Sequence, residues 1–418
     1  MTQAFARRHW IPPGALVFGQ LAHGASWLLL LWIATRGSLA GVTPAMLAWV
    51  HLVALGWFTM AALAILIHAL PGFTEVTWEG ERLARSALWL FGAGSLALVV
   101  AFLTYPAALG WAALSILLGI ALYLLPAYRT LGKAMRGEGA QRAIARATGA
   151  TFAFLILTAL AGAGLAALLG GWPVPAWIAS LPAAHAQLGL FGWLSLLIFG
   201  VSARTIAPIA GGKSRFRWMH VAVGVLALLG VPLLAIGLGL GSQPLVWIGG
   251  ALFAAGAIVY AIDIADCVFR ATVAHRPPQA FVLASVTWLL VSLAAGAGVL
   301  LGEPWRYAYV FLLLIGWVGQ MVNAHAYHIG IRLLSTVYRG DDDETPPGAL
   351  LDARLSWISF AAFQAAVAVV AVGLARYDPA LASYGAAIGF GGWIAMVANV
   401  GVARRRAAHG AGGVRPIA

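Results

Sequence analysis

The chain consists almost entirely of apolar runs that are long enough to cross a lipid bilayer. Hydrophobic residues make up 62% of its 418 residues and charged residues only 9%. A transmembrane helix needs about 20 predominantly apolar residues. Twelve such runs lie at roughly 13–35, 45–70, 85–104, 107–127, 149–170, 183–208, 218–239, 245–269, 279–301, 307–335, 355–375 and 381–403. The sequence therefore predicts an all-α membrane protein, with residues 1–418 as one integral domain in the lipid bilayer.

Basic residues are divided unevenly between the two ends of these spans. Five of them lie between Arg129 and Arg146, whereas the opposite side holds only Arg36, Arg306 and Arg376. Positively charged loops stay in the cytoplasm. We therefore expect both termini in the cytoplasm, a retained first span, and a multi-pass protein of the bacterial inner (plasma) membrane. The net charge of +12 reflects this topology and does not indicate binding to nucleic acid.

The longest polar connections are predicted to be cytoplasmic loops at about 128–148 and 336–354. The second contains four consecutive acids, Asp341 to Glu344. Such a run either binds a cation or forms a solvated loop.

Few side chains offer other chemistry. The single cysteine, Cys267, excludes an internal disulfide and a covalent C-x-x-C-H haem site. Only two acids lie plainly within a span, Asp263 and Asp266. They could relay protons, pair with Arg204, or form a structural salt bridge near the cytoplasmic end.

Three spans share a Gly-Trp pair that is followed, eleven residues after the Trp, by a basic residue. The pairs are Gly56-Trp57, Gly192-Trp193 and Gly316-Trp317, and the basic residues are His68, Arg204 and His328. Because the signature recurs in spans 2, 6 and 10, it predicts three pseudo-symmetric four-helix arcs. Gly392-Trp393 in span 12 is also followed by Arg404. A tryptophan above a snorkelling Arg is therefore the alternative explanation.

Six of the ten histidines lie within predicted spans: His23, His51, His68, His185, His325 and His328. An ionisable side chain in lipid is costly unless it faces a cavity, a partner or a cofactor. Neutral imidazole is also the commonest metal ligand. We therefore expect at least two of these histidines to bind a metal ion or the iron of a haem.

Counting from the Gly-Trp pairs at 1.5 Å per residue sorts the histidines into two tiers. The outer tier, roughly 9–12 Å toward the outside, contains His51 and His185, with His23 as a further candidate. The inner tier, roughly 12–17 Å toward the cytoplasm, contains His68, His325 and His328, with Arg204 at the matching position of span 6.

A haem with two axial histidines needs ligands at similar depth on different helices. His51 with His185 meets this condition, and so does His68 with either His325 or His328. His325 and His328 share one helix face, so they cannot bracket one haem. They could instead share a small metal ion, or one could bind the metal while the other donates a hydrogen bond.

The segment from His51 through Gly56-Trp57 to His68 and Pro71 resembles the second span of haem–copper oxidase catalytic subunits. The similarity is closest to the cbb3-type oxidase and nitric oxide reductase branch, in which a His opens this helix as a low-spin haem ligand. His185 to Trp193 is similar to the same pattern. Span 10, with His325 and His328, resembles the histidine-bearing tenth helix. The resemblance implies one or two b-type haems, electron transport and oxidoreductase chemistry.

The copper site of that family is incomplete in this chain. It needs one His on span 6 and an adjacent His-His pair on span 7, where this sequence has only His220. No tyrosine lies one turn after His185. The chain is therefore interpreted as a degenerate member of the superfamily, similar in size and span number to NnrS-like haem/copper proteins, without an intact copper site.

The first functional hypothesis is a membrane b-type haem protein that transfers electrons, or that binds or reduces nitric oxide or another diatomic gas. Arg204 would neutralise the haem propionates, and a c-type cytochrome or another respiratory subunit would be the partner. Whether the protein is an enzyme stays open. The alternatives are a metal or anion transporter that uses His68, Arg204, His325 and His328, or a non-catalytic subunit of a respiratory complex.

Overall fold

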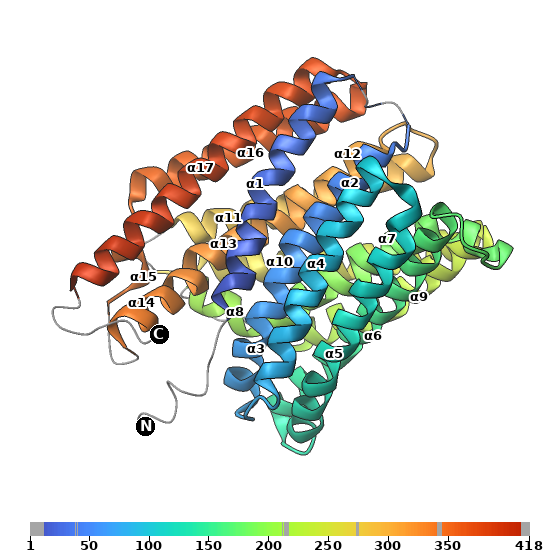
Figure 1. The fold of residues 1–418 in the computed structure, drawn as a ribbon. Coiled ribbons are helices and arrows are strands. Elements are labelled where there is room, and N and C mark those ends of the chain that lie inside the picture. The colour runs from blue at the N-terminus through green and yellow to red at the C-terminus, as the bar shows by residue number, and fades with distance from the viewer. Residues whose placement is uncertain are drawn as a thin grey trace.

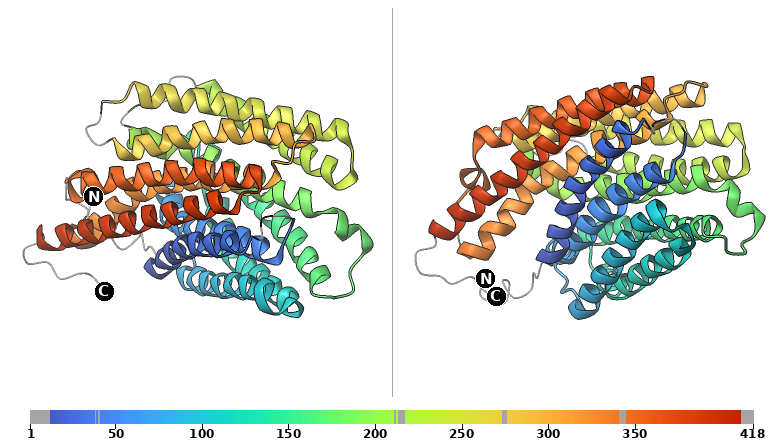
Figure 2. Two further views of the ribbon diagram at one scale, coloured as in Figure 1. Left: turned by 90° about the horizontal axis from the view of Figure 1, so that it is seen from above. Right: turned by 45° about the horizontal axis from the view of Figure 1, so that its top comes forward.

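The structure is a computed structural model that describes residues 12–37, 39, 41–210, 212, 217–272, 276–340 and 345–410. Over these residues it is a bundle of helices without a β-strand (Figures 1 and 2). Twelve helices among them are long and apolar enough to cross a membrane, which confirms the predicted all-α membrane fold. They are Pro13–Thr35, Pro44–Thr74, Glu81–Thr104, Pro106–Ala134, Gln141–Leu169, Pro182–Ser202, Trp218–Leu240, Gln243–Phe269, Pro277–Leu300, Arg306–Arg339, Ala353–Arg376 and Pro379–His409.

The predicted loop at 128–148 is mostly helical. Helix α5 (Leu109–Ala134) and helix α6 (Gly139–Leu169) both extend into it, so the connection is only 135–138. Basic residues with long apolar stems continue a helix beyond the bilayer core because their charged ends reach water. The predicted cation-binding run Asp341–Glu344 lies outside the described residues.

The first span packs against the last one. Helix α1 (Pro13–Thr35, blue) lies beside α17 (Pro379–Gly410, red) in Figure 1. Each of the two helices has a glycine that packs against a tryptophan ring of the other. A Cβ atom at Gly24 would lie 2.6 Å from the Trp393 ring, and one at Gly389 would lie 2.5 Å from the Trp27 ring. Only glycine fits at these two positions, as expected where membrane helices approach closely.

Each of the three repeated Gly-Trp spans contains a π-helix at the same place. These segments are η2 (Leu52–Thr59), η5 (Leu188–Ser195) and η6 (Leu312–Gly319). Each begins five residues before its tryptophan and ends two residues after it. Because π-helical turns are rare and usually short, three matching copies indicate a true repeat. Trp393 lies in an uninterrupted α-helix and is not a fourth copy.

The tryptophans link these three helices by hydrogen bonds. Trp193 donates from Nε1 to the Thr59 hydroxyl at 2.9 Å, and Trp317 donates to the Ser195 hydroxyl at 3.0 Å. Each acceptor lies two residues after the tryptophan of the preceding repeat. The equivalent residue for Trp57 is Gly319, whose added Cβ atom would lie 3.4 Å from the Trp57 ring. Glycine has no hydroxyl, and the Trp57 indole N–H has no hydrogen-bond partner among the described residues.

A second layer of contacts repeats in the same way nearer the predicted outer end. The residue six positions before one tryptophan meets the residue eight positions before the next. At the first interface the ring centres of His51 and His185 are 6.1 Å apart. At the second, Tyr309 donates a hydrogen bond to Gln187 at 3.1 Å. At the third, the ring centres of Trp49 and Phe311 are 5.9 Å apart. The three helices thus contact one another cyclically, and only the first interface carries a histidine pair.

Candidate functional site

The first interface contains a cavity of about 430 Å³. His51 and His185 contribute imidazoles to its wall, and most of the remaining lining is apolar, including Leu47, Phe102 and Ile116. Thr59 and Trp193 also line it. They lie further along their helices toward the predicted cytoplasmic side than the two histidines do, and their hydrogen bond is part of the cavity wall at that level. An apolar cavity with a few convergent polar groups is the usual form of a cofactor site.

The His51 imidazole is oriented by its own helix. His51 ends α2 (Pro44–His51), directly before η2, and its Nδ1 lies 2.7 Å from the carbonyl oxygen of Leu47 one turn earlier. The ring of Phe102, on α4 (Glu81–Thr104), lies 5.2 Å away between ring centres. The ring is half-buried and borders the cavity.

The His185 imidazole is oriented by a neighbouring span. His185 lies in α7 (Pro182–Gln187), and its Nδ1 is 3.0 Å from the carbonyl oxygen of Thr158 on α6. Gly162, one turn after Thr158, makes this contact sterically feasible. A Cβ atom at that position would lie 2.7 Å from Cε1 of His185. The ring therefore sits in a notch of α6 that a larger residue would fill.

The two imidazoles have the same tautomer and lie nearly parallel to each other. Each Nδ1 faces a carbonyl oxygen, so Nδ1 carries the hydrogen in the neutral ring and Nε2 keeps the lone pair. Neither Nε2 has a hydrogen-bond partner among the described residues. The two ring planes are nearly parallel, with an interplanar angle of 16°. A backbone carbonyl that accepts from the other ring nitrogen is the usual support of a metal-bound histidine.

The spacing fits two ligands on opposite sides of one metal ion. With metal–nitrogen distances of about 2 Å, two such imidazoles have ring centres roughly 6 Å apart. A metal ion held by protein alone generally needs more ligands, because structural zinc sites use four and catalytic sites three. No group of three or more metal-binding side chains occurs in the described part of the chain. The pair by itself therefore supplies fewer ligands than these protein-only zinc sites use.

His325, the predicted inner ligand, is engaged in other contacts. It ends α13 (Gln320–His325); its Nδ1 lies 2.8 Å from the Met321 carbonyl oxygen, and its Nε2 lies 2.8 Å from the Thr205 hydroxyl. In the neutral ring, Nδ1 donates to the carbonyl and Nε2 accepts from the hydroxyl. Thr205 belongs to α8 (Leu196–Ala210) of the sixth span. In this arrangement His325 serves as an interhelical hydrogen-bonding residue.

The other inner-tier residues do not join the cavity. His68 lies in α3 (Met60–Thr74) and His328 in the π-helical segment η7 (Ala326–Gly330), and neither lines it. Arg204 on α8 is exposed and also does not line the cavity. The structure thus brings His51 and His185 together at the cavity. The four residues assigned to transport, His68, Arg204, His325 and His328, do not line it.

His23 is fully buried but lies apart from that pair. Its ring stacks on the Trp57 ring, with centres 3.4 Å apart and planes 10° apart. Neither ring nitrogen has a hydrogen-bond partner among the described residues. His23 is not among the residues that line the cavity.

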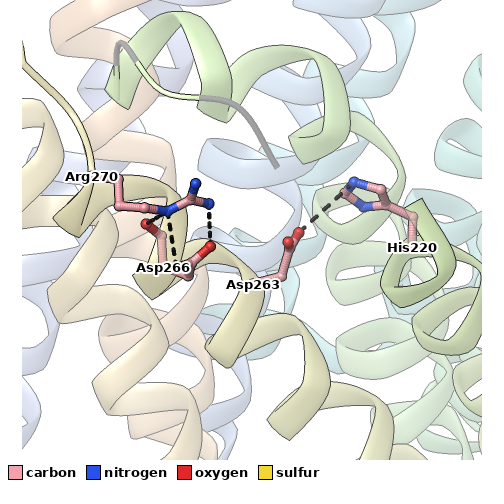
Figure 3. Close-up of polar contacts among 4 residues, drawn as sticks. All are labelled: His220, Asp263, Asp266 and Arg270. Carbon is pink, nitrogen blue, oxygen red and sulfur yellow. Dashed lines mark hydrogen bonds and ion pairs between the residues drawn. The ribbon is translucent and has the colours of Figure 1, made fainter. Parts of the chain in front are cut away.

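One of the two membrane acids forms a salt bridge with an arginine, and the other faces a histidine. Figure 3 shows the side chains of Asp263 and Asp266 on α10 (Gln243–Phe269). Asp266 pairs with Arg270 one turn later, including a 3.0 Å bond from Nε, and so does not pair with Arg204. Asp263 is nearly buried, and its Oδ2 lies 3.8 Å from Nε2 of His220 on α9 (Arg217–Leu240).

Two groups that hold the His185 ring could not be identified from the sequence. The Thr158 carbonyl is backbone, and Gly162 is one of fifty glycines, so neither carries a distinguishing signal. Comparison with known proteins adds nothing to this geometry, because no protein-family model and no curated protein matches the chain.

Proposed function

We propose that the protein is a membrane electron carrier that holds one b-type haem between His51 and His185. The observation that carries this proposal is the 6.1 Å separation of two nearly parallel imidazoles across an apolar cavity. Each ring is fixed through Nδ1 by a backbone carbonyl, which leaves Nε2 for the iron. The single cysteine makes covalent C-x-x-C-H attachment impossible, so the haem would be held by coordination and apolar contacts.

Electron transfer is favoured over catalysis because both axial positions would be filled. A bound haem supplies reversible one-electron exchange at its iron, tuned by axial ligands and burial. The protein would contribute two neutral imidazole ligands and an apolar cavity wall that excludes water. Among the described residues, His51 and His185 are the two histidines that line this cavity.

The predicted orientation places this site in the outer half of the membrane. With both termini in the bacterial cytoplasm, His51 and His185 lie before their tryptophans along spans that run inward. The redox partner would then approach from outside, as a c-type cytochrome or another respiratory subunit would. In the same proposal, the three Gly-Trp helices are the inner walls of three four-helix arcs.

The proposal is tested by the haem content of protein purified from cells that synthesise haem. We expect the absorption spectrum of a six-coordinate b-type haem and about one haem per chain by the pyridine haemochrome assay. His51→Ala and His185→Ala should each abolish the six-coordinate spectrum. His325→Ala is the matched control and should retain it, because His325 bonds to Met321 and Thr205. Haem-free wild-type protein would refute the proposal.

A further inference from the structure

The two imidazoles of the candidate site are held in unequal ways. The Nδ1–H of His185 crosses to another span, where it meets the Thr158 carbonyl oxygen at 3.0 Å. Gly162 closes on the same ring, since its added Cβ atom would lie 2.7 Å from Cε1 and 3.3 Å from Nδ1. Moving this ring toward α6 is sterically blocked, and turning it away breaks an interhelical hydrogen bond.

His51 has no such restraint from another helix. Its hydrogen bond runs to Leu47, one turn earlier in the same helix. The contacts of its ring across the interface are with the rings of Phe102 and His185, at 5.2 and 6.1 Å between centres. Rotation of its side chain therefore breaks one local hydrogen bond and no bond between helices.

We infer that His185 is the permanently held ligand and that His51 is the exchangeable one, which a small diatomic gas can replace. This inference rests on the proposed haem site. It adds which of the two histidines is exchanged and the class of molecule that replaces it. The cavity lining includes Leu98, Ala113 and Phe102, whose ring lies beside that of His51, and such apolar side chains suit an uncharged, weakly polar molecule and disfavour an anion. On exchange, the bond between His51 Nε2 and the iron would break and a bond between the iron and the gas would form, with no electron gained or lost.

A matched pair of ligand deletions tests the assignment, with carbon monoxide as the probe. His51→Gly should keep its haem, become five-coordinate when reduced, and bind carbon monoxide at concentrations roughly tenfold or more below those needed by the wild type. Added imidazole should restore the six-coordinate spectrum. His185→Gly should lose most of its haem during purification.

A second comparison tests the notch in α6 without removing either ligand. Gly162→Ala should displace the His185 ring, raising the haem dissociation rate by roughly ten- to a hundredfold. Gly149→Ala is the control on the same helix, because a Cβ atom there meets nothing within 4 Å. Its haem dissociation rate should equal that of the wild type.

The inference is overturned if His185→Gly keeps haem while His51→Gly loses it, or if both variants behave alike. It is also overturned if His51→Gly is five-coordinate but does not bind carbon monoxide. These outcomes differ from failure of the proposed function, in which the wild type itself contains no haem.

Discussion

The indole N–H of Trp193 donates to the hydroxyl of Thr59 at 2.9 Å, and both residues line the same cavity as the histidine pair. Trp317 makes the equivalent bond to Ser195. Trp57 occupies the third equivalent position, opposite Gly319, and its N–H has no hydrogen-bond partner among the described residues. Two of three matching interfaces are therefore hydrogen-bonded.

Replacing each repeated tryptophan by phenylalanine measures this difference. Trp193→Phe and Trp317→Phe both lose a buried hydrogen bond and leave a hydroxyl without its donor, whereas Trp57→Phe loses none. We expect the first two variants to be less stable than the third by about 1 kcal/mol. Thermal or denaturant unfolding in detergent measures the differences, and the loss of ring volume is common to all three. Equal destabilisation would contradict the account of the interfaces.

The hydrogen bond between His325 and Thr205 should be separable from haem binding. A double-mutant cycle with His325→Ala and Thr205→Val should give a coupling energy of about 1 kcal/mol. The haem content of all three variants should equal that of the wild type. Loss of haem in His325→Ala would contradict this account and would favour His325, the predicted inner-tier residue, as a haem ligand.

The π-helical segment before Trp57 should set the direction of His51. Deleting Ala54 from η2 converts the segment toward an α-helix and turns the preceding residues by about 100°. His51 then no longer faces His185, so we expect haem binding to be lost. Deleting Leu313 from η6 is the control, since it turns Tyr309 and the cavity residue Val310 but does not turn either histidine, so haem should be retained. Haem content relative to folded protein measures both effects.

An ion pair near the predicted cytoplasmic end should make the free energy of unfolding depend on pH in the acidic range. Lys133 pairs with Glu79 and holds the pKa of that carboxyl below its ordinary value of 4.5. A depressed folded pKa gives stability that is present above the unfolded pKa and is lost as pH falls through the folded value. The free energy of unfolding should therefore fall less between pH 6 and roughly pH 3 in Lys133→Ala than in the wild type. The effect should be small and should weaken with salt, because both side chains are nearly half exposed.

The spans were predictable because apolar length alone defines them. Each predicted span overlaps one of the twelve helices, and the ends differ by at most eight residues, as for Gln141–Leu169 against the predicted 149–170. The two outer histidines were predictable as a pair because depth along a helix follows from counting residues. The helical extension of α5 and α6 was missed because the basic residues from Arg129 to Arg146 were interpreted as a loop. Such residues also lie on helices that leave the bilayer.

The cross-helix contacts were not predictable from one sequence. Nothing near His325 indicates that Thr205, on another span, would bond to its Nε2. The same holds for the Thr158 carbonyl oxygen beside His185. Arg204 shares its repeat position with His68 and His328, yet it is exposed on α8. Position within a repeat gives depth, whereas rotation about the helix axis decides which neighbour a side chain meets.

Electron–nuclear double resonance on the oxidised protein tests the central claim most directly, with ¹⁵N-histidine labelling to identify the ligand nuclei. The account predicts a low-spin ferric haem coupled to two histidine nitrogens, with one coupling lost in His51→Gly. A spectrum with a single histidine ligand, or with two that both persist in His51→Gly, would show that these two imidazoles do not share one iron.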